Sequence, residues 1–152
     1  MTKKIISAAM VLVMLCLCLA GCGCESKPQA NPDTDDVAKQ KVEELMENFK
    51  NALNNHDTNA YKNLTTDTMR SSDNDINNCF DQIEEFILWE IAFNSKEQNG
   101  TTYEIPIHYY VTFSKEYKGS QYKTGINNMT DIFIIVKDGD SYKLDNIRRL
   151  GH

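Results

Sequence analysis

The sequence predicts an α+β domain in which three N-terminal helices pack on a four-stranded antiparallel meander. Up to about residue 87, apolar residues recur every three or four positions, which is the period of an amphipathic helix. From residue 88 onward they alternate with polar residues, as in half-buried strands. Asn-Gly, Gly-Ser and Asp-Gly pairs separate the alternating segments, as hairpin turns do. We assign residues 36–152 to this domain.

Three segments carry the helical pattern. The first helix is expected over residues 37–55, where seven apolar residues from Ala38 to Leu53 share one face. A short second helix follows, with Asp57 as its N-cap. The third is expected from Asp75 to about Phe86, and Cys79 belongs to its apolar stripe. We therefore expect Cys79 to be a buried free thiol, although a disulfide with Cys24 stays open in an exported protein.

The four strands are expected over residues 88–95, 102–113, 123–136 and 141–148. A two-residue turn at Gly119-Ser120 would place Ile107 opposite Ile132, so that apolar residues meet on one face of the sheet. The same register places His108 opposite Asp131 on the outer face, meaning the face away from the helices. We interpret that pair as an exposed ion pair rather than as an acid–base site.

The position of the first strand has two solutions. A two-residue turn at residues 99–100 places Trp89, Ile91 and Phe93 on the outer face, where they form an exposed apolar patch typical of an interface. It also lets Glu90 project into the interior. A three-residue loop places the three apolar residues in the core instead. The sequence leaves both arrangements open.

An export signal precedes the domain. Lys3 and Lys4 are followed by sixteen mostly apolar residues, fewer than the roughly 20 that span a bilayer. The segment Leu19-Ala20-Gly21-Cys22 resembles the bacterial lipobox, which implies cleavage between Gly21 and Cys22 and acylation of the Cys22 sulfur. Two or three acyl chains such as palmitate would hold the chain firmly on the membrane. Residues 22–35 are expected to form a flexible tether of about 20 Å.

The net charge limits the kinds of partner that the protein can bind. Loss of Lys3 and Lys4 leaves 14 basic residues against 22 acidic residues, a net charge of −8. Phosphate backbones repel such a surface, so we expect no nucleic-acid partner. Anionic headgroups repel it too, so the lipid on Cys22 must anchor the protein to the extracytoplasmic face of the cell membrane without a basic patch.

Two segments of the domain resemble the nuclear transport factor 2-like (cystatin-like) family. VEELMENFKNALNNHDTNAYKNL looks like the family's opening helix with a capped second helix behind it. IFIIVKDGDSYKLDNI looks like its closing hairpin. The resemblance covers about residues 36–152 and is shared with bacterial lipoproteins of unknown function. It implies a conical cavity between helices and sheet, in a family that includes both enzymes and binding proteins.

No catalytic signature stands out in the sequence. Metal-ligand spacing, phosphate loops and serine elbows are missing, so we expect no catalytic residue, metal or cofactor. The candidate pocket residues are Glu90, Tyr109, Asn128 and Thr130. The leading hypothesis is a non-catalytic binding module for a small molecule, an envelope component or a protein partner. The alternatives are a hydrolase or isomerase using Glu90 or His108, and a protein that forms a homodimer through the outer sheet face.

Overall fold

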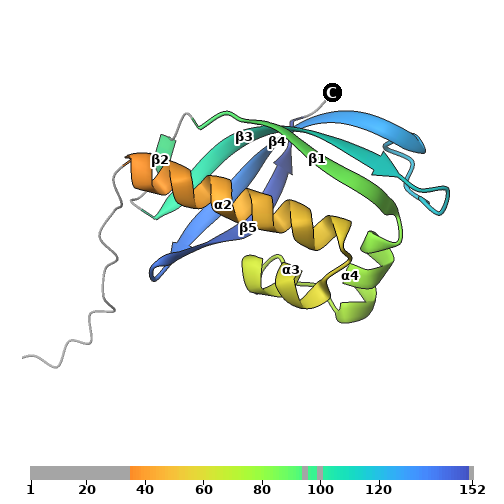
Figure 1. The fold of residues 1–152 in the computed structure, drawn as a ribbon, viewed down its shortest axis with the longest axis horizontal. Coiled ribbons are helices and arrows are strands. Elements are labelled where there is room, and N and C mark those ends of the chain that lie inside the picture. Colours follow the sequence, from red (N-terminus) through yellow and green to blue (C-terminus); the bar gives the residue numbers. More distant parts are fainter. Residues whose placement is uncertain (1–34, 94–95, 99–100, 151–152) are drawn as a thin grey trace, which may run out of the picture.

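A computed structural model describes residues 35–93, 96–98 and 101–150, which form three helices and one antiparallel open sheet (Figure 1). The strand order β1-β3-β4-β5 is the expected four-stranded meander, and a short strand, β2, pairs with β3. The expected signal peptide and most of the tether lie outside the described residues. The elements are α2 (Asp35–Asn54), α3 (Thr58–Leu64), α4 (Asp73–Phe80), β1 (Ile83–Ile91), β2 (Lys96–Gln98), β3 (Thr102–Phe113), β4 (Gly125–Asp138) and β5 (Ser141–Arg149).

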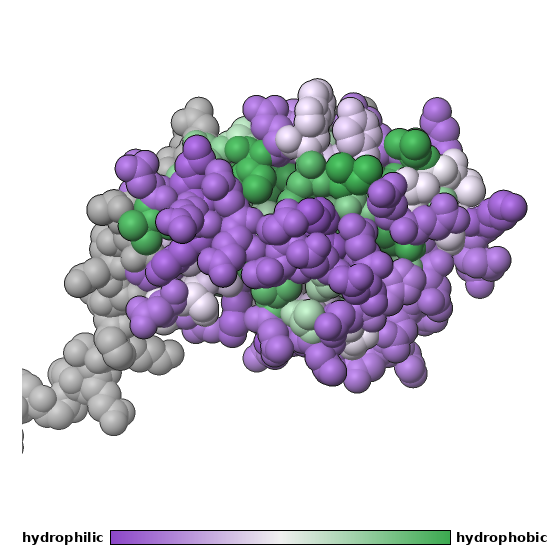
Figure 2. All heavy atoms as spheres, viewed as in Figure 1, coloured by the Kyte–Doolittle hydropathy of each residue, from purple (hydrophilic) through white to green (hydrophobic). Residues whose placement is uncertain are grey.

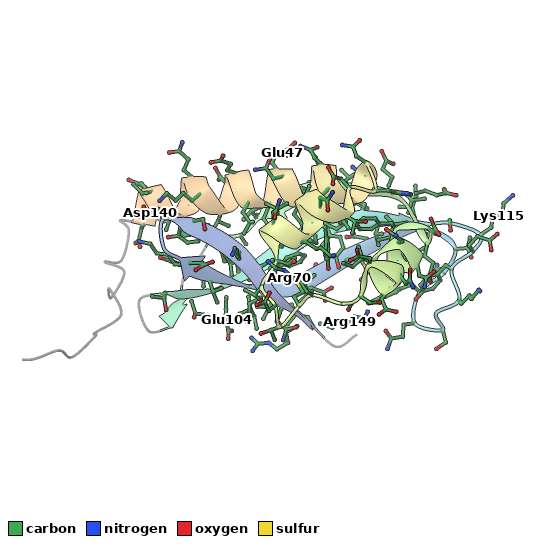
Figure 3. The ribbon with its side chains drawn as sticks, turned by 90° about the horizontal axis from the view of Figure 1, so that it is seen from below. Glu47, Arg70, Glu104, Lys115, Asp140 and Arg149 are labelled. Carbon is green, nitrogen blue, oxygen red and sulfur yellow. The ribbon has the colours of Figure 1, made fainter. Side chains whose placement is uncertain are left out.

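The helices lie on one side of the sheet, which we call the inner face (Figure 3). Helix α2 crosses the sheet, and the seven apolar residues expected on its face, from Ala38 to Leu53, are all buried. Asp57 caps α3 as expected, because its carboxylate accepts a hydrogen bond from the Ala60 amide at 2.9 Å. Of the helices in the described ranges, none combines the length and apolar character that a membrane span needs.

The third helix is shorter than the sequence predicts. Helix α4 ends at Phe80, and the chain enters β1 at Ile83 instead of continuing as a helix to Phe86. The first strand exists but is displaced from the expected 88–95: β1 covers 83–91, and residues 94–95 lie outside the described residues. A run such as IEEFILWEI fits both periods, and its pairing with β3 along most of its length decides between them.

The register between β3 and β4 differs by one residue from the expected one. Ile105 lies opposite Phe133 and Ile107 lies opposite Asp131, because no tight turn forms at Gly119-Ser120. An irregular loop, residues 114–124, connects the strands instead. One step of register turns every side chain of a strand to the other face. The inner face of β4 therefore carries Met129, Asp131, Phe133 and Ile135, and not Ile132 and Ile134.

Strand β1 follows neither of the two expected arrangements. A register shift between Leu88 and Glu90 changes which residues face the core partway along the strand. Trp89 consequently lies on the outer face, 63% exposed and in contact with the rings of His108 and Tyr110. Ile91 and Phe93, which both expectations placed on the same face as Trp89, pack against the core. Figure 2 shows hydrophobic side chains along β1 beside the polar surface of α2.

Candidate functional site: a cavity with a buried carboxylate

A cavity of about 300 Å³ lies where the ends of β1, β3, β4 and β5 meet α3, α4 and the second half of α2. Its walls are mostly apolar and aromatic, contributed by side chains such as Phe49, Phe86, Val111 and Phe133. The helices cover this end of the inner face with few residues, since α3 and α4 have only seven and eight. The volume lies at the small end of the range for ligand pockets.

Asp131 is the polar group in the depth of this cavity. It lies on the inner face of β4 and is only 3% exposed. The hydroxyl of Tyr109 donates a hydrogen bond to its Oδ2 at 2.8 Å, and the Leu150 amide donates to Oδ1 at 3.2 Å. Burial, followed by the bond to this carboxylate, raises the pKa of Tyr109. The phenol therefore keeps its proton and donates it in the hydrogen bond to Asp131.

An aromatic stack and an arginine border the mouth of the cavity. In the 114–124 loop, the rings of Tyr117 and Tyr122 stack on Phe113 with centroids 4.2 and 5.4 Å apart. The Arg149 guanidinium lies 5.1 Å from the centroid of the Tyr122 ring, a favourable cation–π distance. Arg149 is exposed and lies opposite Asp131 in the β4–β5 register. The site thus combines a buried acceptor with a cation at the surface.

Cys79 also lines the cavity, at its mouth, where its side chain is exposed. The expectation of a buried thiol is wrong because the α4 stripe ends at Phe80, so that Ile76 and Phe80 fill the core positions. The protein surrounding the sulfur on its other sides still raises the pKa of the thiol through desolvation. Cys79 forms no disulfide within the described residues. Residue 24 lies outside them, so a pairing of the two cysteines stays an open prediction.

Of the four candidate pocket residues, Tyr109 lines the cavity. The other three lie elsewhere. Glu90 is exposed and opposite His108, and Asn128 is exposed and opposite Tyr110. Thr130 lies opposite His108, and its hydroxyl is 2.8 Å from the His108 Nδ1. All three belong to the outer face, because the bulge in β1 and the shifted register of β4 turn them away from the helices.

The expected His108–Asp131 pair does not form. His108 contacts Thr130 and the Trp89 ring on the outer face, whereas Asp131 is buried on the inner face. The sequence contained a weak signal for Asp131. Among the alternate positions 129, 131, 133 and 135, Asp131 is the charged residue and the other three are apolar. The intervening positions 132, 134 and 136 are apolar as well, so the alternation alone cannot choose the buried set.

The arrangement suits a polar organic molecule more than a metal ion. Asp131 is a single carboxylate, and the described ranges contain no group of three or more side chains suited to a metal site. A ligand that donates a hydrogen bond would satisfy the free acceptor capacity of Asp131 while its carbon atoms contact the apolar walls. Comparisons of the chain with protein-family models and with curated proteins find no match.

Proposed function

We propose that this protein is a lipoprotein held on the extracytoplasmic face of the cell membrane, whose domain is a non-catalytic binding module of the nuclear transport factor 2-like type. The order of helices and strands supports the family assignment, which implies a conical cavity between the two layers. The lipobox-like segment ending at Cys22 supports the anchor. The proposed tether connects the anchor to the domain, so that the cavity can bind molecules near the membrane.

The observation that carries the binding proposal is the buried carboxylate of Asp131 in an apolar cavity. Burying a charged group is costly unless it is hydrogen-bonded, and two protein donors already compensate part of that cost. An aliphatic side chain at this position would avoid the cost, so stability alone does not explain the carboxylate. Glu90 and His108, the residues expected for a hydrolase or isomerase, lie outside the cavity, so an enzyme in this pocket would have to use other residues, such as Asp131.

Ligand-detected NMR with a library of small organic molecules tests the binding proposal. Binders should lose their signal change when Cys79 at the cavity mouth is labelled with a bulky maleimide in a Cys24→Ser background. The Cys79→Ser variant, treated in the same way, should keep binding and serves as the control. Binding that survives the label would place the ligand elsewhere, and a library without binders would count against the proposal.

Mass spectrometry of the protein from its native cells tests the anchor. We expect a mature chain that begins at Cys22 and carries acyl chains, and a Cys22→Ala variant that leaves the membrane fraction. An intact Met1, or an unmodified thiol at position 22, would remove both the anchor and the assigned location.

A second candidate function is homodimerisation through the outer face. The observation that favours it is the exposure of Trp89 and Ile87 on that face, which lies opposite the side that α2, α3 and α4 cover. Interface cores are enriched in aromatic residues of this kind. Light scattering should find a dimer that Trp89→Ser converts to a monomer. A monomer at high concentration of the unaltered chain would exclude this candidate.

A further inference from the structure

Two neighbouring arginines of β5 lie on opposite faces of the sheet and differ in their partners. Arg148 lies on the outer face, and its guanidinium forms an ion pair with Glu104 at 2.5 Å. Arg149 lies at the cavity mouth and, within residues 35–93, 96–98 and 101–150, forms no salt bridge. Its contact is the face of the Tyr122 ring. The protein is rich in acidic residues. A cation that lies beside a cavity and has no carboxylate partner in the described part of the chain can pair with an anion from outside.

The two charged groups of the site differ in depth. Asp131 is almost fully buried, so only the inner end of a ligand reaches it. Arg149 is exposed, so it meets the outer end of the same ligand. Apolar and aromatic side chains, including Phe113 and Val111, line the space around them. The cavity therefore presents a hydrogen-bond acceptor inside, apolar walls and a cation at the rim.

We infer that the cavity takes a compact molecule with a hydroxyl or amino donor at its inner end and a carboxylate at its outer end. This inference rests on the proposed binding function and specifies its ligand. The volume of about 300 Å³ suits a ligand built on a single ring or a short aliphatic chain. The donor satisfies Asp131, and the carboxylate pairs with Arg149. A purely cationic ligand would gain from Asp131 but would be opposed by Arg149.

Calorimetric titration with four related probes tests the ligand class. The protein is the mature chain in nanodiscs, and empty nanodiscs give the blank. The full probe is 4-hydroxyphenylacetate, while phenylacetate lacks the hydroxyl, 4-methylphenol lacks the carboxylate, and tyramine carries an ammonium group instead. We expect 4-hydroxyphenylacetate to bind most tightly and each of the other three at least about tenfold more weakly, the loss of one charge-assisted hydrogen bond.

Variants assign each end of the probe to a residue. Arg149→Gln should lower the affinity for 4-hydroxyphenylacetate about tenfold and leave the affinity for 4-methylphenol unchanged, because only the first probe carries a carboxylate. Arg148→Gln, which changes the neighbouring arginine on the outer face, should leave both unchanged. Asp131→Asn should weaken the probes with a hydroxyl and spare phenylacetate. Arg149 is exposed, so its variant keeps the test decisive even if Asp131→Asn fails to fold.

Failure of this inference is distinguishable from failure of the binding function. Tighter binding of tyramine than of 4-hydroxyphenylacetate, or an unchanged affinity in Arg149→Gln, would overturn the ligand class and leave a cavity that binds something else. If none of the four probes binds while the library yields a cavity ligand, the inference is wrong and the binding function stands. Absence of any cavity binder would overturn both.

Discussion

The inner and outer faces of the sheet are built from similar residues, but these residues differ in burial and in contacts. Ile135 and Ile134 are neighbours in β4, yet the first is fully buried on the inner face and the second is half-buried on the outer face. Tyr109 and Tyr110 in β3 are divided in the same way. Arg149 and Arg148 in β5 also lie on opposite faces, but both are exposed, and they differ in their partners. Side chains of the same type therefore acquire different roles from the face they occupy. Among the described residues, α2, α3 and α4 create this difference, because they all lie on one side of the sheet (Figure 3).

The paired isoleucines offer the largest test of this comparison. Ile135→Ala should lower the free energy of unfolding by about 2–5 kcal/mol, since it leaves a cavity in the core. Ile134→Ala should cost less, about 1–2 kcal/mol, because its side chain stays partly exposed to water. Urea unfolding of the two variants measures both values. The reverse order would restore the register expected from the sequence and contradict the described one.

The adjacent tyrosines test the buried polar contact. Tyr109→Phe removes the hydroxyl that donates to Asp131, and we expect a loss of about 1.5–3 kcal/mol because the acceptor is a buried carboxylate. Tyr110→Phe, on the outer face, should change the stability by less than about 0.5 kcal/mol. Thermal and urea unfolding would show the difference. Equal effects would mean that the Tyr109 hydroxyl finds water as readily as its neighbour does.

The ion pair of the outer face should contribute less. Glu104→Gln removes the partner of Arg148, whose side chain is 51% exposed, and exposed pairs contribute about 0.2–1 kcal/mol. The loss should shrink as salt is added, because exposed charges are screened. Chemical unfolding at low and high ionic strength measures it. A larger loss that is insensitive to salt would indicate that the outer face is covered, as in the proposed homodimer.

Cys79 provides the smallest effect, which concerns reactivity rather than stability at neutral pH. Desolvation raises the thiol pKa in the folded protein, so a smaller fraction is thiolate at pH 8 than in the unfolded chain. Alkylation of Cys79 should therefore be slower in the native protein, and its pH profile should be displaced upward. Mass spectrometry of the Cys79 peptide follows the reaction. The sign also implies that this group's contribution to stability is present below the unfolded thiol pKa and falls as pH rises through the raised value.

The sequence was most informative where one pattern had one solution. The position of α2 was predictable, together with the seven apolar residues on its buried face and the Asp57 cap of α3. Helix periodicity and capping depend on residues close together in the sequence. The antiparallel meander was predictable too, since alternating segments separated by turn residues leave few topologies. The end of the third helix was not, because IEEFILWEI satisfies both periods.

The site was decided by tertiary structure. Both sets of alternate residues in β4 are apolar over 132–136, so sequence could not tell which set faces the helices, and the expected register buried the wrong one. The loop at 114–124, in which Tyr117 and Tyr122 stack on Phe113, takes the place of the expected two-residue turn, and the register differs by one residue. That single step moved Asp131 from the surface to the cavity.

The sequence by itself determined the fold class of the domain and the apolar residues on the buried face of α2. Both depend on the spacing of apolar residues that lie close together in the sequence. Only the packing of helices on the sheet decided that Asp131 is buried while Glu90 is exposed. The physical reason is that a strand has two faces and no local preference between them. Burial against α2 is a long-range contact, and it selects the face.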